Sequence, residues 1–394
     1  MRQGTPGFVG DRLKQAREAR DLSAAALADL LGVTRASIYQ YEGGLQSPSP
    51  EAMRRLSEVL NVPIQRFLMP MLDRPAGVRF YRCMAAATKR ARVRAERKYE
   101  WVRDICDYIS RYIKLRAVKF PDVGVSRDPA HISMEEIEEA ANHARAFFNL
   151  PDGPVDNIVW LLEKHGAIVA RYELEADTLD AFSEWEPVGQ RPFIVLSSNK
   201  NSAARSRFDA AHELGHLILH RNTPASYFCQ TDSFKLMERQ AHRFASAFLM
   251  PESVFVGELY APTLEAFRAA KMRWRVAIAA MIMRVTDLNL VDEEQARKLW
   301  INLGRRKWRT REPFDDAIEP ERPRYMSRCI QGMLDRKMVS ADDLSFQLGL
   351  PTQDIEQLAG LSPGMLGPVA QDGAGAGIDG DDDFEAVIRL PHAS

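Results

Sequence analysis

Two histidines and a glutamate stand close together in the run His212-Glu213-Leu214-Gly215-His216. Residues four apart share one face of a helix, so the two imidazoles could bind one metal ion. Glu213 would lie beside that ion, where a carboxylate can take a proton from water and pass it to a leaving amine. Zinc in such a site lowers the pKa of a bound water toward ~7 and polarises a scissile carbonyl. Gly215 is expected to keep this helix face open to metal and substrate.

A catalytic zinc needs a third protein ligand, and three side chains are candidates. A predicted helix over 235–250 contains Glu238 and His242, one turn apart on one face. His220 continues the first helix, but eight residues after His212 the face has turned by ~80° and risen by ~12 Å, so the two cannot share an ion. Glu238 is favoured, and His242 is kept as the alternative. The competing interpretation is a pair of structural histidines on a solvated helix.

The context of the motif adds a family resemblance. Residues 205–220 read RSRFDAAHELGHLILH, and Glu238 is followed by Ala241, Phe244-Ala245 and Leu249-Met250-Pro251. Over roughly residues 130–300 the chain resembles the ImmA/IrrE family of zinc metallo-endopeptidases. The resemblance implies a Zn²⁺ ion held by His212, His216 and Glu238, with Glu213 as the general base.

Two further expectations follow from this resemblance. The position four after the ligand glutamate is usually Asn or Asp, which accepts a hydrogen bond from a ligand histidine. Here it is His242, which could accept through one ring nitrogen or could detune the site. In zincin folds the peptide lies along an edge strand above the active helix. Residues 193–197 are the candidate for that strand, and a plain core strand is the alternative.

Residues 12–68 have the spacing of a helix-turn-helix. Ser23 and Thr34 are expected to cap the second and third helices, and Gly32 to form the tight turn, because a positive φ costs glycine little. The N-terminal end of the third helix would enter the major groove. The candidate DNA-binding residues there are Thr34, Arg35, Ser37, Tyr39 and Gln40. Arg35 could bind guanine and Gln40 adenine.

This stretch resembles the Cro/CI-type (XRE) helix-turn-helix domain. The resemblance rests on Leu13–Arg17, Ser23, Leu27-Ala28, Gly32-Val33-Thr34, Ile38, Tyr41-Glu42 and Pro48-Ser49. It implies binding to double-stranded DNA, usually as a homodimer on paired half-sites. Ala24 and Ala26 replace the usual Gln and Glu, which puts the strength or register of the DNA contact in doubt. The alternative is a helical module that contacts proteins only.

Composition sets the limits of these interpretations. The 394 residues carry a net charge of -1 and are 45% apolar, which allows two or three domains and gives no overall attraction to nucleic acid or membrane. Basic charge is local, with 14 Lys or Arg against 5 Asp or Glu in residues 71–120. A solvated helix face is expected there, and contact with DNA phosphates is the alternative. Scattered cysteines, no signal peptide and no long apolar run favour a cytoplasmic protein without a membrane span.

These patterns predict a mostly α fold with a small β-sheet. The predicted units are a five-helix helix-turn-helix domain at 8–70, a basic helical linker at 71–125, an α+β zincin-like domain at 126–260, a C-terminal helical region at 261–362 and a disordered tail at 363–394. Helices are expected at 79–118, 133–149, 154–164, 202–220, 235–250 and 263–287, and strands at 167–172 and 193–197.

The order of the domains predicts a DNA-binding transcriptional regulator fused to a zinc-dependent endopeptidase that cleaves a regulatory partner, such as a repressor. One alternative resembles the short-chain fatty acyl-CoA assimilation regulators, transcription factors whose zinc domain would sense a ligand without cleaving. The other is an antitoxin-like interaction module.

Overall fold

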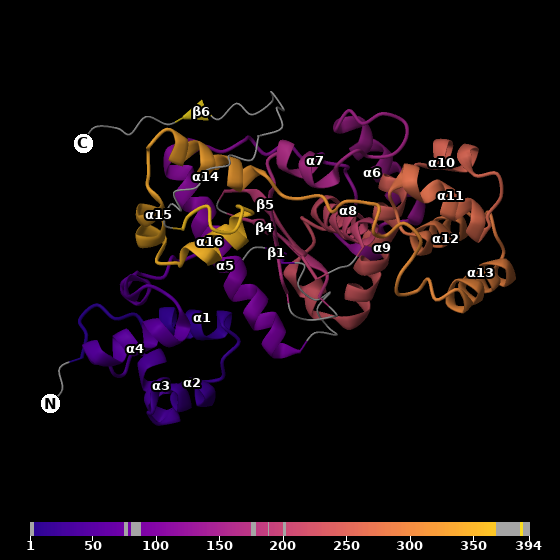
Figure 1. The fold of residues 1–394 in the computed structure, drawn as a ribbon. Coiled ribbons are helices and arrows are strands. Elements are labelled where there is room, and N and C mark those ends of the chain that lie inside the picture. The colour runs from indigo at the N-terminus through magenta and orange to yellow at the C-terminus, as the bar shows by residue number, and fades with distance from the viewer. Residues whose placement is uncertain are drawn as a thin grey trace.

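The computed structural model describes residues 4–74, 78–79, 88–174, 179–187, 189–199, 202–367 and 387–388. As predicted, the fold is mostly helical with one small sheet (Figure 1). Most of the predicted tail at 363–394 lies outside the described residues. None of the helices within those ranges is both long and apolar enough to cross a membrane.

Short helices build the N-terminal domain. They are α1 (Gly10–Ala19), α2 (Ala24–Leu31), α3 (Arg35–Glu42), α4 (Pro50–Leu60) and the 3-10 helix η1 (Ile64–Leu68). The predicted caps are confirmed, because the side chains of Ser23 and Thr34 accept hydrogen bonds from the backbone N–H groups of Ala26 and Ser37. Gly32 has a φ of 66° and ends α2, as the predicted turn requires.

Helix α5 (Lys89–Tyr112) packs on α1 and connects the N-terminal domain to the rest of the molecule (Figure 1). Residues 80–87 of the predicted helix at 79–118 lie outside the described residues, and within the described ones the helix starts after Thr88 and ends six residues earlier than predicted. Ile113 has an extended backbone, with φ -123° and ψ 131°, and begins the short strand β2 (Ile113–Lys114). That strand pairs with β6 (Val387–Ile388).

The basic side chains of α5 are largely used inside the molecule. Arg97 donates a hydrogen bond to Glu18 of α1 at 2.8 Å, and Arg90 donates to Asp21 at 2.6 Å. Lys98 is only 7% exposed. Arg97 and Arg90 thus join α5 to the N-terminal domain, whereas Lys98 lies over the ring of Tyr172, so a simple solvated face does not describe these positions.

A four-stranded sheet lies at the centre of the molecule. Its order is β1 (Val78–Arg79), β4 (Ala181–Glu186), β5 (Arg191–Ser197) and β3 (Ile168–Tyr172). β5 runs parallel to β3 and antiparallel to β4. The prediction that 193–197 offers an edge to a substrate is therefore wrong. Both edges of β5 are paired, and its residues after Arg191 are all buried.

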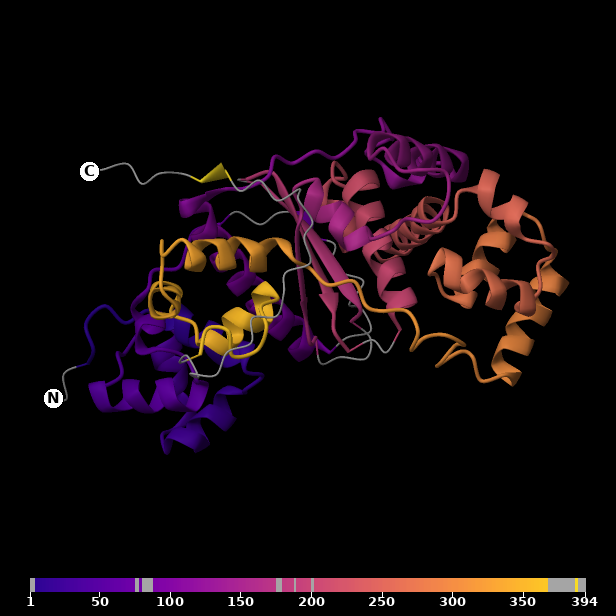
Figure 2. The same ribbon diagram turned by 45° about the horizontal axis from the view of Figure 1, so that its top comes forward.

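The sheet separates two hydrophobic cores. Along β3, Ile168, Ala170 and Tyr172 face a core shared with the N-terminal domain and α5, while Val169 faces a second core. This alternation is the period-two pattern of a strand that is buried on both faces. Figure 2 shows the sheet between the two groups of helices.

Eight α-helices of the described chain lie on the side of the second core. They are α6 (Met134–Phe147), α7 (Ile158–Lys164), α8 (Ala203–Leu219), α9 (Thr231–Leu249), α10 (Glu252–Glu258), α11 (Leu264–Trp274), α12 (Ile278–Asp287) and α13 (Glu293–Arg305). Ser133 starts α6 with the predicted capping box. The prediction of one helix over 263–287 is wrong, because Arg275 is left-handed with a φ of 52° and a new helix starts after it. At the first residue of α12, the backbone N–H of Ile278 donates a hydrogen bond to the Glu312 carboxylate.

Three further helices return to the first core. They are α14 (Tyr325–Asp335), α15 (Ala341–Leu348) and α16 (Thr352–Ala359). The Arg66 guanidinium donates to the Leu348 carbonyl at 2.9 Å, and Arg20 donates to Asp354 at 3.0 Å. The N-terminal domain is therefore bound both by α5 and by α15 and α16 near the end of the described chain.

A buried carboxylate joins the two halves of the chain. Glu163, at the end of α7, is fully buried and accepts the backbone N–H groups of Arg324 and Tyr325 at 3.0–3.1 Å. Burial raises the pKa of Glu163 to about 7, although these hydrogen bonds lower it. Folding is therefore favoured by the protonated form of this side chain.

Glu163→Gln should make the protein more stable than the wild type at alkaline pH. The folded pKa lies above the ordinary value of 4.5, so the stability that Glu163 contributes is complete below about pH 4.5 and is lost as pH rises through 7. Glutamine keeps an acceptor oxygen and does not titrate. Denaturant unfolding from pH 5 to 8 should show a variant advantage growing to about 2–3 kcal/mol. A difference that does not change with pH would contradict this.

Candidate metal centre and DNA-binding face

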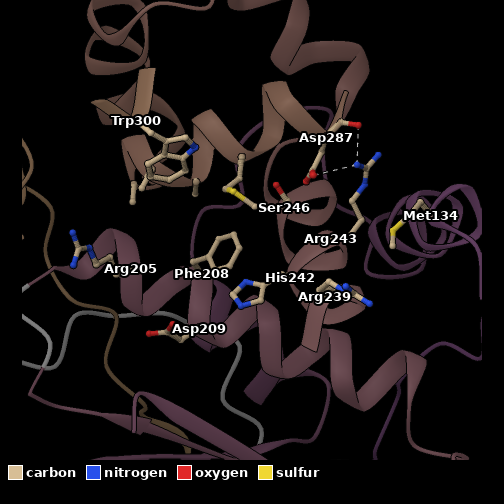
Figure 3. A pocket seen from close by; sticks show the side chains of 14 residues that line it. Met134, Arg205, Phe208, Asp209, Arg239, His242, Arg243, Ser246, Asp287 and Trp300 are labelled. Atoms are coloured by element: carbon tan, nitrogen blue, oxygen red, sulfur yellow. Dashed lines mark hydrogen bonds and ion pairs between the residues drawn. The ribbon is translucent and has the colours of Figure 1, made fainter. Parts of the chain in front are cut away.

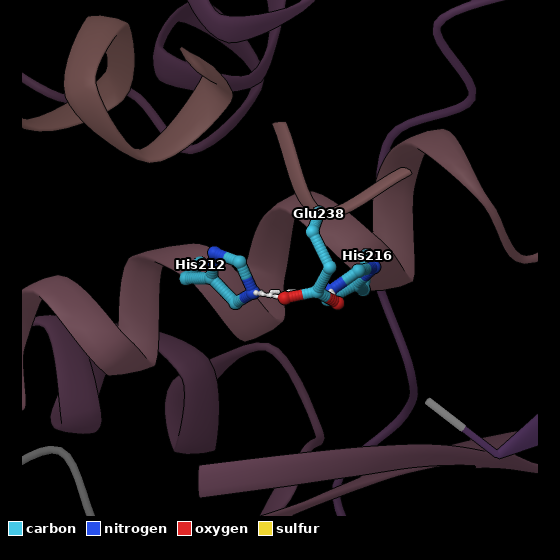
Figure 4. Close-up of side chains that lie close together, drawn as sticks. All are labelled: His212, His216 and Glu238. Carbon is cyan, nitrogen blue, oxygen red and sulfur yellow. Dashed lines mark hydrogen bonds and ion pairs between the residues drawn. The ribbon is translucent and has the colours of Figure 1, made fainter. Parts of the chain in front are cut away.

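Helices α8 and α9 bring two histidines and a glutamate to one point (Figure 4). The Nε2 atoms of His212 and His216 are 3.1 Å apart. One oxygen of Glu238 is 3.1 Å from His216 Nε2, and the other is 3.5 Å from His212 Nε2. These ligand atoms all lie within 4.8 Å of one another, so the group could hold a metal ion. Two imidazoles and one carboxylate form a donor set that catalytic zinc sites use.

Gly215 allows α8 and α9 to approach closely. A Cβ atom at this position would lie 3.1 Å from the Phe244 ring and 3.2 Å from the Ala241 carbonyl. The expectation that Gly215 opens the helix face to substrate is therefore wrong. It faces α9, and a larger residue would push that helix, with Glu238, away from the histidines.

Burial and hydrogen bonding set the pKa values of the three candidate ligands. Burial raises the pKa of Glu238, but hydrogen bonds to His212 and His216 outweigh it and hold that pKa well below its ordinary value. Burial lowers the pKa of His212, and the bond to Glu238 reverses this, so the net shift is upward. Burial keeps the pKa of His216 below its ordinary value. Metal binding therefore competes with a proton at His212.

A chain of hydrogen bonds fixes the tautomer of His216. Gln240 donates its amide to the Pro129 carbonyl at 2.7 Å, so its oxygen accepts from His220 Nε2 at 3.0 Å. Burial lowers the pKa of His220 to about 3, so the ring is neutral and its Nδ1 is an acceptor. That atom lies 3.0 Å from Nδ1 of His216. His216 must then carry its proton on Nδ1, which leaves Nε2 free for a metal.

Glu213 lies beside this group and is 1% exposed. Its Oε2 accepts a hydrogen bond from the Ser183 hydroxyl of β4 at 2.6 Å. Burial raises the pKa of Glu213 to about 7, although His212 and the bond from Ser183 lower it. A carboxyl group with a pKa near neutrality can both take up and return a proton.

His242 lies one turn after Glu238 and outside the group of three. Its exposed ring is tilted against the His212 ring, with centroids 4.5 Å apart, and stacks on Phe208 at 5.7 Å. Nδ1 of His212 is buried and has no hydrogen-bond partner among the residues that the structure describes. That His242 accepts a hydrogen bond from a ligand histidine stays a prediction, and the contact between the rings is what the structure shows.

Sequence reasoning missed the supporting residues of the site. His220 was considered only as a ligand, although its place four residues after His216 repeats the spacing that identified the pair. Ser183 lies in β4, whose sequence AFSEWE carries buried polar side chains and lacks the apolar run that indicates an inner strand. Gln240 gave no sequence signal, because its partner Pro129 lies more than 100 residues earlier and its partner His220 lies at the end of a different helix.

Helix α3, the predicted recognition helix, presents its N-terminal end to solvent. Arg35 and Tyr39 are exposed, and Ser37 and Gln40 are half-buried, while Thr34 caps the helix. The Arg35 guanidinium donates to the Tyr39 hydroxyl at 2.7 Å and lies 5.2 Å from the ring centroid. The arginine is therefore held in one direction along the helix surface.

An ion pair orients α3 within the domain. Arg17 of α1 donates to Glu42 at the end of α3, with nitrogen–oxygen distances of 2.5 and 3.0 Å, and both residues are buried. A bidentate ion pair of this kind fixes the relative orientation of the two side chains as well as their distance. It keeps the opposite face of α3 turned outward.

Two family models match the chain. One is a peptidase M78 model described as the IrrE N-terminal-like domain, which matches residues 162–286, and the other is described as helix-turn-helix and matches residues 13–67. The chain thus has an XRE-type helix-turn-helix domain followed by an IrrE N-terminal-like domain. This confirms the predicted combination of an ImmA/IrrE domain with a helix-turn-helix.

Curated relatives match 55 residues, or 14% of this chain. A putative HTH-type transcriptional regulatory protein of Methanocaldococcus jannaschii is 40% identical over 17% of its length. One with the same description from Methanothermobacter thermautotrophicus is 46% identical over 18% of its length. An SPbeta prophage-derived HTH-type transcriptional regulator of Bacillus subtilis is 38% identical over 51%. The match therefore spans about a sixth of the two archaeal relatives and half of the bacterial one.

Proposed function

We propose that this chain, which joins a helix-turn-helix domain to an IrrE N-terminal-like domain, is a DNA-binding regulator that also acts as a zinc endopeptidase on a regulatory partner protein, such as a repressor. The observation that carries this is the position of Glu213 beside the group formed by His212, His216 and Glu238. That group supplies the ligands, and Glu213, which lines the same small cleft as the ligand His212, supplies the proton-transfer group.

The side chains around the metal group would each have a different role in the reaction. Bound zinc would act as a Lewis acid on the scissile carbonyl and make water a stronger nucleophile at neutral pH. His220 keeps the metal-facing nitrogen of His216 unprotonated. Ser183 occupies one oxygen of Glu213, which leaves the other to receive a proton and deliver it to the leaving amine.

The peptide substrate would lie along β4. Ala181 of that strand lines a small cleft together with His212 and Glu213. Within the described chain, β1 pairs with β4 at Glu184 and Trp185, so the half of β4 nearest Glu213 is where an added strand would pair. Main-chain hydrogen bonds to this strand would set the scissile bond over the metal group.

Cleavage of a partner tests the proposal directly. Purified full-length protein, loaded with zinc, should cut at least one of the proteins encoded by its neighbouring genes into fragments that mass spectrometry can identify. Treatment with a chelator should stop the reaction, and zinc should restore it. A zinc-saturated protein that cuts none of these partners would instead favour a transcription factor whose metal domain senses a ligand.

Arg35→Ala should weaken operator binding by about 10- to 100-fold, because one arginine contact to guanine contributes ~1–3 kcal/mol. Gel-shift titration on a fragment selected from genomic DNA measures this. As a homodimer on double-stranded DNA, the wild type should select inverted half-sites. Arg297→Ala, an exposed arginine of α13, is the control and should bind normally. Equal affinity of Arg35→Ala and the wild type would show that this face does not bind DNA.

A further inference from the structure

A cavity of about 550 Å³ adjoins the metal group (Figure 3). It lies between α8, α9, α12 and α13, and Met134 closes one side. Its walls are mainly apolar, formed by Met134, Phe208, Ala277, Ala280, Met283 and Trp300. A cavity of this size is larger than any one side chain and falls in the range of ligand pockets.

The cavity and the catalytic cleft share two lining residues. Asp209 and His242 line both the cavity and the small cleft that contains His212 and Glu213. The His242 ring lies against the ring of His212. A molecule bound at the metal group can therefore reach past His242 into the apolar space.

One polar side chain inside the cavity lacks a partner. Ser246 is 2% exposed, and its hydroxyl makes no hydrogen bond within the structure. A buried hydroxyl without a partner costs free energy, which a ligand with a polar tip would recover. Arg243 lines the same wall, but its guanidinium already contacts the Glu138 carboxylate and the Asp287 carbonyl. It therefore stabilises the wall of the cavity.

We propose that this cavity is the specificity pocket of the peptidase and receives a large aromatic side chain, tyrosine best of all, from a residue flanking the scissile bond. The apolar walls bind the ring, and Ser246 pairs with the phenolic hydroxyl. Three arginines, Arg205, Arg239 and Arg243, line the cavity against two aspartates, Asp209 and Asp287, and this excess of positive charge disfavours lysine and arginine there. This inference rests on the proposed function, because the metal group must hold the neighbouring peptide bond.

Hydroxamates test the pocket without requiring turnover. The probes are the hydroxamates of N-acetylated alanine, lysine, phenylalanine and tyrosine, which share one metal-binding group and differ in side chain. Calorimetry on the zinc-loaded full chain should give an affinity at least about 10-fold higher for phenylalanine than for alanine, and about three- to tenfold higher again for tyrosine. Lysine should bind no better than alanine.

Variants test whether the higher affinity for the aromatic probes comes from the cavity. Ala280→Phe fills it and should remove the preference for aromatic probes, while Ala269→Phe on the exposed side of α11 should retain it. Met283→Trp narrows the same space from a half-exposed position and serves if Ala280→Phe does not fold. Ser246→Ala should bind tyrosine and phenylalanine probes equally and still prefer both over alanine.

The outcomes separate this inference from the proposed function. A protein that holds no zinc overturns the proposed function, and the pocket assignment with it. A protein that holds zinc and binds all four probes equally overturns the pocket alone. N-acetyltyrosine amide, which lacks the hydroxamate, is the last probe. If it binds the zinc-free protein as tightly as the tyrosine hydroxamate binds the loaded one, the cavity takes a free small molecule, and the substrate assignment is wrong.

Discussion

Glu213→Gln should keep zinc bound and lower peptide cleavage by about 10²- to 10⁴-fold, the usual contribution of a general base. Glutamine has the size of glutamate, and its oxygen can still accept the hydrogen bond from Ser183. It cannot take up a proton. The measurement is kcat/KM on a cleaved partner or on a peptide spanning its cut site, together with the zinc content of each protein.

The matched control is Glu252→Gln, at an exposed position of α10. It makes the same chemical change outside the cleft and should leave cleavage unchanged. If Glu213→Gln cuts as fast as the wild type, the peptidase assignment of this site is wrong. If DNA binding is also measured, both variants should bind the operator normally, because neither residue lies in the N-terminal domain.

Glu238→Gln should lower zinc affinity by more than about 100-fold, which exceeds the usual effect of losing a supporting residue around a metal. The amide is a poorer ligand than the carboxylate, and it cannot balance the charge of the ion. Competition with a chromogenic chelator measures the affinity. The same change should abolish cleavage, because the metal is lost.

His242→Ala is the informative comparison for the third ligand. Both residues lie on α9, one turn apart, but only Glu238 belongs to the group whose ligand atoms converge. His242→Ala should retain zinc within about tenfold of the wild type, since its ring packs on His212 and Phe208 and lies outside the group of converging ligand atoms. A variant that loses zinc as fully as Glu238→Gln would make His242 the third ligand instead.

Local features of the fold could be predicted because they depend on neighbouring residues. The caps at Ser23 and Thr34 and the turn at Gly32 each involve a few positions in sequence. The pairing of His212 with His216 follows from helix periodicity alone. These are the parts of the N-terminal domain and the metal group that the structure reproduces.

The features that sequence reasoning missed depend on distant partners. An edge strand and a core strand both remained open for β5, because strand order is set by pairing with β3 and β4, which no local pattern encodes. The break at Arg275 is stabilised by Glu312, which caps the next helix from 34 residues away. Gly215 was assigned to the substrate side because its neighbour Phe244, on another helix, could not be placed from sequence.

Strand β4 has a mechanical consequence for regulation. On one side its Ser183 touches Glu213, while on the other Phe182 packs on Tyr99 of α5 with ring centroids 5.7 Å apart. The same α5 is tied to α1 of the DNA-binding domain. A peptide strand added to β4, as proposed above, would therefore lie on the strand that packs on α5, the helix in contact with α1. If peptide binding changes DNA binding, β4 and α5 would provide the contact between the two sites, and no additional domain would be required.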